Sequence, residues 1–192
     1  MRIVAGTAKG VRLARVPRGV RPLSDRAREG VFSSIGPDLI DGAAVVDLFA
    51  GTGAIGIEAL SRGAARATFV DRSAGAVASI RRNLELARVG ERARVVTSEV
   101  GRFLTRNDNS SGPFDLAFCD PPYELGGAEL DAVLRELADG RVGGHASTIV
   151  LTRGRQSSTP VIPLHWAIAK ELRYGDSLVI LIRPTDLAYF RP

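Results

Sequence analysis

Short apolar runs alternate with stretches of helical periodicity through most of the chain, and this alternation limits the fold more than any other feature. Runs of four to six residues predict strands at Ala44–Phe49, Ala67–Asp71, Arg94–Thr97, Phe114–Cys119 and Ser147–Thr152. The intervening segments predict helices at Ile55–Arg62, after Ser73, around Phe103 and over residues 130–137. Strands that alternate with helices need right-handed crossovers, so we expect an α/β fold with a doubly wound parallel sheet.

Both ends of the chain depart from this alternation. Trp166–Tyr174 and Ser177–Arg183 are separated only by Gly175 and Asp176, so they predict a C-terminal antiparallel hairpin. Arg2–Ala5 and Val11–Val16 predict a small N-terminal β-hairpin.

A linker with Pro17, Gly19 and Pro22 leads to a predicted helix that begins near Ser24 or Asp25. We therefore expect a basic hairpin extension over residues 1–22 and one main domain over residues 23–192.

Composition excludes several classes of protein. The chain has 192 residues, of which 45% are apolar and 24% charged, which is enough for one sizeable core. No apolar run approaches the roughly 20 residues of a membrane-spanning helix, and the basic N-terminus lacks the apolar stretch of a signal peptide. Cys119 is the only cysteine, so no internal disulfide or cysteine zinc site can form. We expect a cytoplasmic monomer without a bound metal.

Positive charge is concentrated at the N-terminus. Of the 26 basic and 21 acidic residues, residues 1–30 hold eight basic and two acidic ones. An arm with such an excess is typical of a surface that meets phosphates, although a solvated arginine-rich terminus would look the same. The residues expected to contact a nucleic acid are Arg2, Lys9, Arg12, Arg21, Ser24, Arg26 and Arg28.

A glycine-rich loop follows the first predicted strand and opens a helix. Gly51, Gly53 and Gly56 allow the backbone to turn tightly and to approach a ligand closely. Asp71 ends the second strand, where a carboxylate can accept hydrogen bonds from the ribose hydroxyls of a nucleoside. This pattern fits a dinucleotide as well as S-adenosylmethionine.

Two further acidic residues favour S-adenosylmethionine over a dinucleotide. Asp47, within the first strand, could hold the loop and the ammonium group of an amino-acid cofactor, whereas a pyrophosphate would gain nothing from it. Glu99, after the third strand, could accept from an adenine amino group.

Asp120-Pro121-Pro122-Tyr123 follows the fourth predicted strand, at the edge where ligands of open α/β sheets bind. The Asp120 carboxylate and the Pro121 carbonyl could accept both hydrogens of an exocyclic amino group, and the prolines would fix these acceptors in advance. Tyr123 offers a flat face on which an extruded base can stack. A rigid exit from the strand is the plainer alternative. Cys119 is expected in the core rather than in catalysis.

With these motifs placed, the chain resembles the RsmD family, bacterial enzymes that methylate N2 of a guanosine in small-subunit (16S) ribosomal RNA. The resemblance is carried by residues 2–6, 21–29, 47–53, 58–64 and 120–123, and residues 21–29 are its most distinctive part. Ser24 stands where a threonine is common, and Glu99 where an aspartate or a neutral residue can occur.

The resemblance implies a seven-stranded Rossmann-like class I methyltransferase fold with S-adenosyl-L-methionine as cofactor. It also implies a target guanosine in the RNA loop that faces the P-site transfer RNA, within a partly assembled small subunit. The catalytic loop would be Asp120, Pro121, Pro122 and Tyr123. The cofactor site would comprise Asp47, Phe49, Gly51, Gly53, Asp71, Arg72, Glu99 and Val100.

Three other functions compete with this one. A DNA adenine-N6 methyltransferase uses the same Asp-Pro-Pro-Tyr logic, but it usually carries a separate target-recognition region. A basic RNA-binding assembly factor with a decayed cofactor site is a second, although the glycines and the catalytic tetrad are intact. An NAD-linked dehydrogenase is the third, and it leaves residues 120–123 unexplained, with His145 and His165 outside the recognisable site segments.

Overall fold

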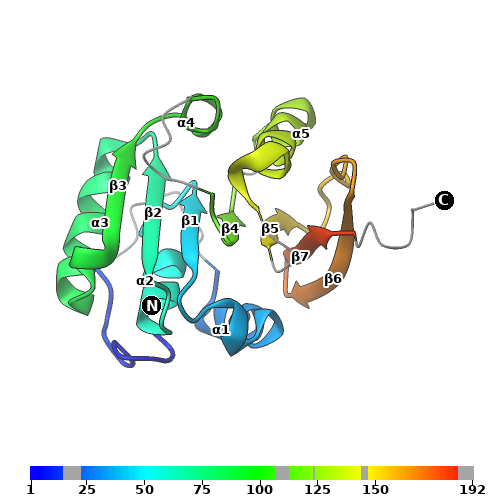
Figure 1. Cartoon of the computed structure of the whole chain (residues 1–192). Helices are drawn as coiled ribbons and strands as arrows, with labels where there is room; N and C mark the ends of the chain where they lie inside the picture. Colours follow the sequence, from blue (N-terminus) through cyan, green and yellow to red (C-terminus); the bar gives the residue numbers. More distant parts are fainter. Residues whose placement is uncertain (15–22, 107–112, 123, 144–146, 186–192) are drawn as a thin grey trace.

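The computed structural model describes residues 1–14, 23–106, 113–122, 124–143 and 147–185. They form three layers, with a sheet between two layers of helices (Figure 1). The sheet has seven strands in the order β3-β2-β1-β4-β5-β7-β6, and the first five are parallel. The strands are β1 Ala44–Leu48, β2 Arg66–Asp71, β3 Ala93–Thr97, β4 Leu116–Cys119, β5 Thr148–Gly154, β6 Trp166–Tyr174 and β7 Ser177–Pro184.

Helices cover both faces of the sheet. One core cluster, on one face, contains apolar residues of α1 Asp25–Ile35, α2 Ala54–Ser61 and α3 Ala74–Ala87. The core cluster on the other face contains apolar residues of α4 Val100–Leu104 and α5 Gly127–Glu136. Short helical turns lie at Pro37–Leu39, Gly90–Arg92 and Leu137–Arg141. No helix in the described ranges is both long and apolar enough to span a membrane.

The central strands are apolar because both of their faces are covered. In β1, Val45 joins the core under α1 to α3, while Val46 and Leu48 join the core under α4 and α5. This alternation follows from the two-residue period of a strand. Across one core, the rings of Phe32 on α1 and Phe118 on β4 lie 5.5 Å apart, which fixes α1 over the middle of the sheet.

The structure confirms the predicted fold class and the C-terminal hairpin. β6 and β7 pair antiparallel, and β7 is inserted between β5 and β6. The helix predicted after Ser73 is capped by that residue, whose hydroxyl accepts from the Ala76 N–H at 3.3 Å. The helix predicted to begin near Ser24 is capped by Ser24, which accepts from the Ala27 N–H at 3.1 Å.

The N-terminal segment differs from the predicted hairpin. In the described residues it is a shorter hairpin, with one antiparallel bridge between Arg2 and Arg12 in place of two regular strands. Backbone hydrogen bonds from Ile3 N–H to the Val11 carbonyl and from Leu13 N–H to the Met1 carbonyl flank this bridge. Ile3, Ala8 and Leu13 are buried in the same core as α1 and α2, so the segment packs as part of the main body. The predicted linker, with Pro17, Gly19 and Pro22, lies outside the described residues apart from its junction with α1.

Candidate active site

A cavity of about 630 Å³ opens at the carboxyl ends of the parallel strands, within the range of a small-molecule site. Its wall includes the loop after β1, the ends of β2 and β5, the start of α4 and the segment after β4. Five acidic and three basic residues line it, namely Asp71, Glu99, Asp120, Glu124, Glu129, Arg28, Arg72 and Arg153. This excess of carboxylates favours a ligand that carries positive charge.

The glycine loop turns as its sequence predicts. Phe49, Gly51 and Gly53 have φ values of 57°, 57° and 73°, the left-handed region that favours glycine. Phe49 and Gly51 line the cavity. Gly53 caps α2 and does not appear in the cavity wall.

Asp71 connects β2 to this loop. Its Oδ2 accepts a hydrogen bond from the Gly51 N–H at 2.9 Å, and its Oδ1 accepts one from the Ser73 N–H at 2.8 Å. Each oxygen of a carboxylate can accept a second hydrogen bond. The Asp71 side chain, which lines the cavity, therefore retains capacity for two hydroxyl donors.

Asp47 supports the loop from behind. The expectation that it would contact a cofactor ammonium is not met, because Asp47 is 2% exposed and lies outside the cavity wall. Its Oδ2 accepts from the Gly56 N–H at 2.9 Å, which ties β1 to the first turn of α2. Burial raises the pKa of Asp47 to about 8, opposed by the Gly56 hydrogen bond and reinforced by the charges of Asp120 and Asp71.

The far side of the cavity holds the remaining residues of the predicted cofactor site. Arg72 and Glu99 both line it and form an ion pair at 3.4 Å, with side chains 71% and 59% exposed. Such an exposed pair contributes little to stability, so both side chains are available to a ligand. Val100, the first residue of α4, also lines the cavity.

The segment after β4 lies at the same edge of the sheet. Asp120, Pro121 and Pro122 line the cavity, and burial raises the pKa of Asp120 to about 7. Tyr123 lies outside the described residues. Cys119 is 1% exposed and packs in the core, as expected, and burial raises its pKa.

Arg28 corrects one prediction. It was expected to contact RNA at the surface, but it is 1% exposed. Its Nη2 donates to Asp25 at 2.9 Å and to the Arg2 carbonyl, and its Nε lies 3.5 Å from the Glu58 carboxylate. Arg28 lies on the buried face of α1 together with Val31, because residues three positions apart share one face of a helix.

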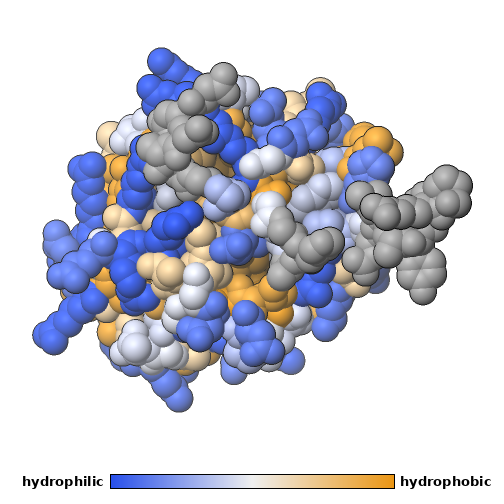
Figure 2. All heavy atoms as spheres, in the orientation of Figure 1, coloured by the Kyte–Doolittle hydropathy of each residue, from blue (hydrophilic) through white to orange (hydrophobic). Residues whose placement is uncertain are grey.

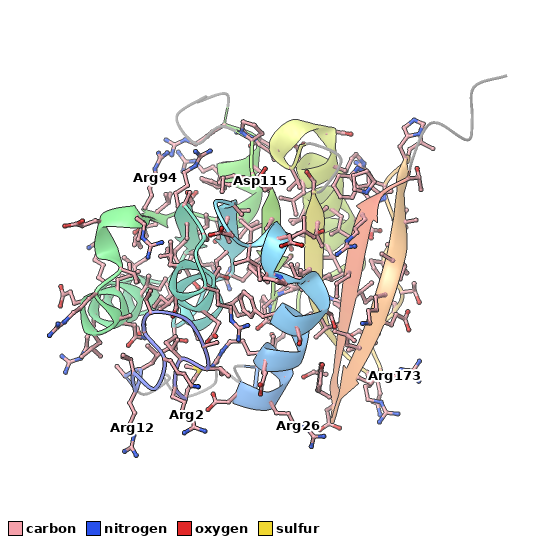
Figure 3. All side chains as sticks on the ribbon, turned by 60° about the horizontal axis from the view of Figure 1, so that its bottom comes forward. Arg2, Arg12, Arg26, Arg94, Asp115 and Arg173 are labelled. Carbon is pink, nitrogen blue, oxygen red and sulfur yellow. The ribbon has the colours of Figure 1, made fainter. Side chains whose placement is uncertain are left out.

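The other predicted RNA-binding residues have mixed positions. Arg2, Lys9, Arg12 and Arg26 lie at the surface, and Figure 3 shows Arg2, Arg12 and Arg26 pointing away from the body along one edge. Ser24 is exposed and caps α1, while Arg21 lies outside the described residues. The face drawn in Figure 2 carries hydrophilic side chains around its margin, with apolar atoms nearer the middle.

Sequence reasoning missed several residues of the cavity wall, and two of them lie on β5. Thr152 and Arg153, at the end of β5, line it beside Asp120. The predicted strand stopped at Thr152, and no motif marks either residue. In the part of the chain that the structure describes, no cluster of three or more His, Cys, Asp or Glu side chains could hold a metal ion.

A family model described as "Conserved hypothetical protein 95" matches residues 1–183. The chain belongs to this family. The ribosomal RNA small subunit methyltransferase D of Escherichia coli K12 is 34% identical over 89% of this chain and 83% of its own length. The protein of the same name from Haemophilus influenzae is 32% identical over 91% of this chain and 89% of its own. These relatives confirm the resemblance to the RsmD family.

Solved structures agree with the family assignment. The yhhF protein from Escherichia coli has a TM-score of 0.82 at 33% identity, covering 96% of this chain and 98% of its own. A protein from Thermus thermophilus has a TM-score of 0.80 at 31% identity, covering 95% and 99%. At 16% identity and a TM-score of 0.65, magnesium protoporphyrin IX methyltransferase from Synechocystis, solved with bound S-adenosylmethionine, shares the fold over 83% of this chain and 79% of its own.

Proposed function

We propose that this protein transfers a methyl group from S-adenosylmethionine to the exocyclic N2 of a guanosine in small-subunit (16S) ribosomal RNA. The observation that carries the proposal is the placement of Asp120, Pro121 and Pro122 in the wall of the same cavity as Gly51 and Asp71. One cavity thus joins a nucleoside-binding loop to acceptors for an amino group. The Escherichia coli relative, named for small-subunit ribosomal RNA methylation, supports the choice of substrate.

The residues present fit the cofactor. Asp71 keeps two acceptor positions for ribose hydroxyls, and Phe49 and Gly51 would lie against the nucleoside. Arg72, Glu99 and Val100 would complete this end of the site. S-adenosylmethionine carries a sulfonium whose methyl is electrophilic and an ammonium group, and the acidic cavity suits both charges. The pyrophosphate of NAD would meet the same carboxylates unfavourably, which disfavours a dehydrogenase.

Asp120 and the Pro121 carbonyl would orient the target amino group. The lone pair of an exocyclic purine nitrogen is delocalised into the ring, so the free amine is a poor nucleophile. Two acceptors that hold both hydrogens draw the nitrogen towards tetrahedral geometry and direct its lone pair outwards. The methylated nitrogen must then release a proton. A carboxylate whose pKa is about 7 is well matched to receive it near neutral pH.

Tyr123 would stack on the extruded base, and a stacked base contributes about 1–3 kcal/mol to binding. The basic side chains at the surface, Arg2, Lys9, Arg12 and Arg26, would contact RNA phosphates. We further propose that the protein acts as a cytoplasmic monomer, on RNA within a partly assembled small subunit.

Mass-spectrometric mapping of small-subunit ribosomal RNA tests the proposal. RNA from cells that lack the protein should lose one N2-methylguanosine, and purified protein with S-adenosylmethionine should restore it. Partly assembled small-subunit particles and protein-free RNA are compared as substrates in the same assay. Loss of an N6-methyladenine instead, or no change in any modified base, would contradict the proposed function.

A further inference from the structure

Arg153 is a cation inside the cavity to which the proposed function gives no role. It is the penultimate residue of β5 and is only 8% exposed. It lines the cavity together with Asp120, Pro121 and Pro122. A guanidinium stays charged under all physiological conditions, so this positive charge is held permanently beside the catalytic loop.

In the described part of the chain, no acidic side chain neutralises the charge of Arg153. Its buried Nε has no hydrogen-bond partner, and no ion pair engages its guanidinium, among the residues that the structure describes. Glu124 and Glu129 line the same cavity but are exposed and form no ion pair with it. Leaving a nearly buried charge without a partner costs stability. A ligand that brings acceptor atoms to Arg153 would offset this cost.

The order of the strands places Arg153 on the substrate side of Asp120. Along the edge of the sheet, Asp71 ends β2, the glycine loop follows β1, Asp120 follows β4 and Arg153 is the penultimate residue of β5. Neighbouring strands are about 4.8 Å apart. Asp71 and Arg153 therefore flank Asp120 from opposite directions. The cofactor nucleoside belongs to the side of Asp71, so the acceptor for Arg153 belongs to the group that receives the methyl.

The depth of Arg153 indicates which part of the RNA it meets. A base whose amino group reaches Asp120 must enter the cavity, whereas its phosphates remain nearer the mouth. Arg153 is less exposed than Asp120, so the base edge reaches it more readily than the backbone does. A guanidinium fork matches the O6 and N7 acceptors of guanine, while adenine presents a donor amino group at position 6.

We propose that Arg153 selects guanine, by donating hydrogen bonds to O6 and N7 of the base whose 2-amino group Asp120 holds. This inference rests on the proposed function and deepens it. Adjacent strand ends are about as far apart as the 2- and 6-substituents of a purine ring, so one base can contact both residues. Arg153 thereby becomes a specificity-determining residue.

The test removes O6 from the target base and keeps its 2-amino group. Small-subunit particles are reconstituted with guanine or 2-aminopurine at the position that the mapping identifies, since 2-aminopurine keeps the 2-amino group but lacks O6. Single-turnover methylation is measured for the wild type, Arg153→Met, Arg153→Lys and Arg155→Met. Arg155 is an exposed residue two positions further along the chain, and it serves as the matched control.

We expect the wild type to methylate guanine about 10- to 100-fold faster than 2-aminopurine, the effect of losing one charge-assisted hydrogen bond. Arg153→Met should slow the guanine reaction more than the 2-aminopurine reaction, which loses only the N7 contact, and should bring the ratio of the two rates close to one. Arg153→Lys should retain part of the preference, and Arg155→Met all of it. The ratio within one variant does not depend on how much of that protein is folded.

Three results would overturn the inference. No change in either rate for Arg153→Met would show that Arg153 does not contact the base. Equal slowing of both substrates, which leaves the ratio of the rates unchanged, would indicate a contact with a phosphate or N7 and not with O6. Weaker S-adenosylmethionine binding by Arg153→Met in calorimetry would assign Arg153 to the cofactor. Failure of the wild type to methylate guanine in the particles would contradict the proposed function instead.

Discussion

The Asp71 carboxylate accepts a hydrogen bond from the Gly51 N–H at 2.9 Å, and this contact joins the end of β2 to the loop after β1. The two residues are 20 positions apart in sequence. Because both also line the cavity, the contact that shapes the loop belongs to the proposed ligand site. Changes at Asp71 should therefore affect binding and loop geometry together.

Asp71→Ala should weaken S-adenosylmethionine binding at least tenfold. It removes acceptors for the ribose hydroxyls, and hydrogen bonds to a charged group contribute about 1.5–3 kcal/mol each. Asp71→Asn keeps one oxygen acceptor and should have a smaller effect. Isothermal titration calorimetry measures both, with Asp38→Ala, outside the cavity wall, as the control. Equal affinity in all four proteins would exclude Asp71 from the cofactor site.

Asp120→Ala should retain cofactor and RNA binding but slow methyl transfer by about 10²–10³, the usual effect of removing one preorganised partner of a transition state. Asp120→Asn should be milder, because its amide oxygen still accepts one hydrogen bond. Single-turnover rates at saturating cofactor and RNA check the order Asp, Asn, Ala. A normal rate for Asp120→Ala would show that residues 120–122 form only a rigid loop after β4 and take no part in catalysis.

The rate of methyl transfer should rise with pH through about 7 and level off above it. Burial raises the pKa of Asp120 to about 7, and only the ionised carboxylate accepts hydrogen bonds with both oxygens. Protonation below this pH therefore removes the active form. Single-turnover rates measured over a range of pH should show this rise in the wild type and no such rise in Asp120→Asn. If both proteins show the same rise, a group other than Asp120 is responsible for it.

Gly56→Ala should destabilise the protein, by the roughly 1–3 kcal/mol typical of overpacking. A Cβ there would lie 2.4 Å from Cε1 of the buried Phe69 and 3.1 Å from Oδ2 of Asp47. Gly101→Ala on α4 is the control, since its Cβ would meet nothing within 4 Å among the described residues, and alanine favours a helix by about 0.5–1 kcal/mol. Denaturant unfolding measures both variants, and shifts of the same sign would contradict this packing argument.

Neutralising the exposed basic side chains of the N-terminal segment and α1 should weaken RNA binding and make it less dependent on salt. The triple variant Lys9→Gln, Arg12→Gln and Arg26→Gln should lower the salt slope by about 2, at ~0.7 per phosphate contact with single strands. Cofactor binding should not change. Deleting the N-terminal segment is a poorer test, because it would remove Ile3 and Leu13 from the core. RNA binding titrations over a range of salt concentrations measure the slope. An unchanged slope would show that these side chains do not contact RNA phosphates.

The sequence by itself determined the fold class, where two of the helices begin and the edge of the sheet that carries the site. Periods of two and 3.6 residues report which elements form, and the ends of parallel strands meet at one edge. Asp71 and Asp120 could therefore be assigned to that edge from their positions at the ends of predicted strands. The same local signals identified Ser73 as a cap and placed the start of α1 near Ser24.

Only the tertiary structure decided which side chains face the cavity. Arg28 looked like part of a basic arm, but it is buried on α1 beside Glu58 of α2, a partner that no local pattern reveals. Arg153 lay beyond the predicted strand, whereas pairing with Leu178 of β7 extends β5 past it and holds it in the cavity wall. Local periodicity reports the conformation of a segment, while the direction of a charged side chain depends on neighbours that are distant in sequence.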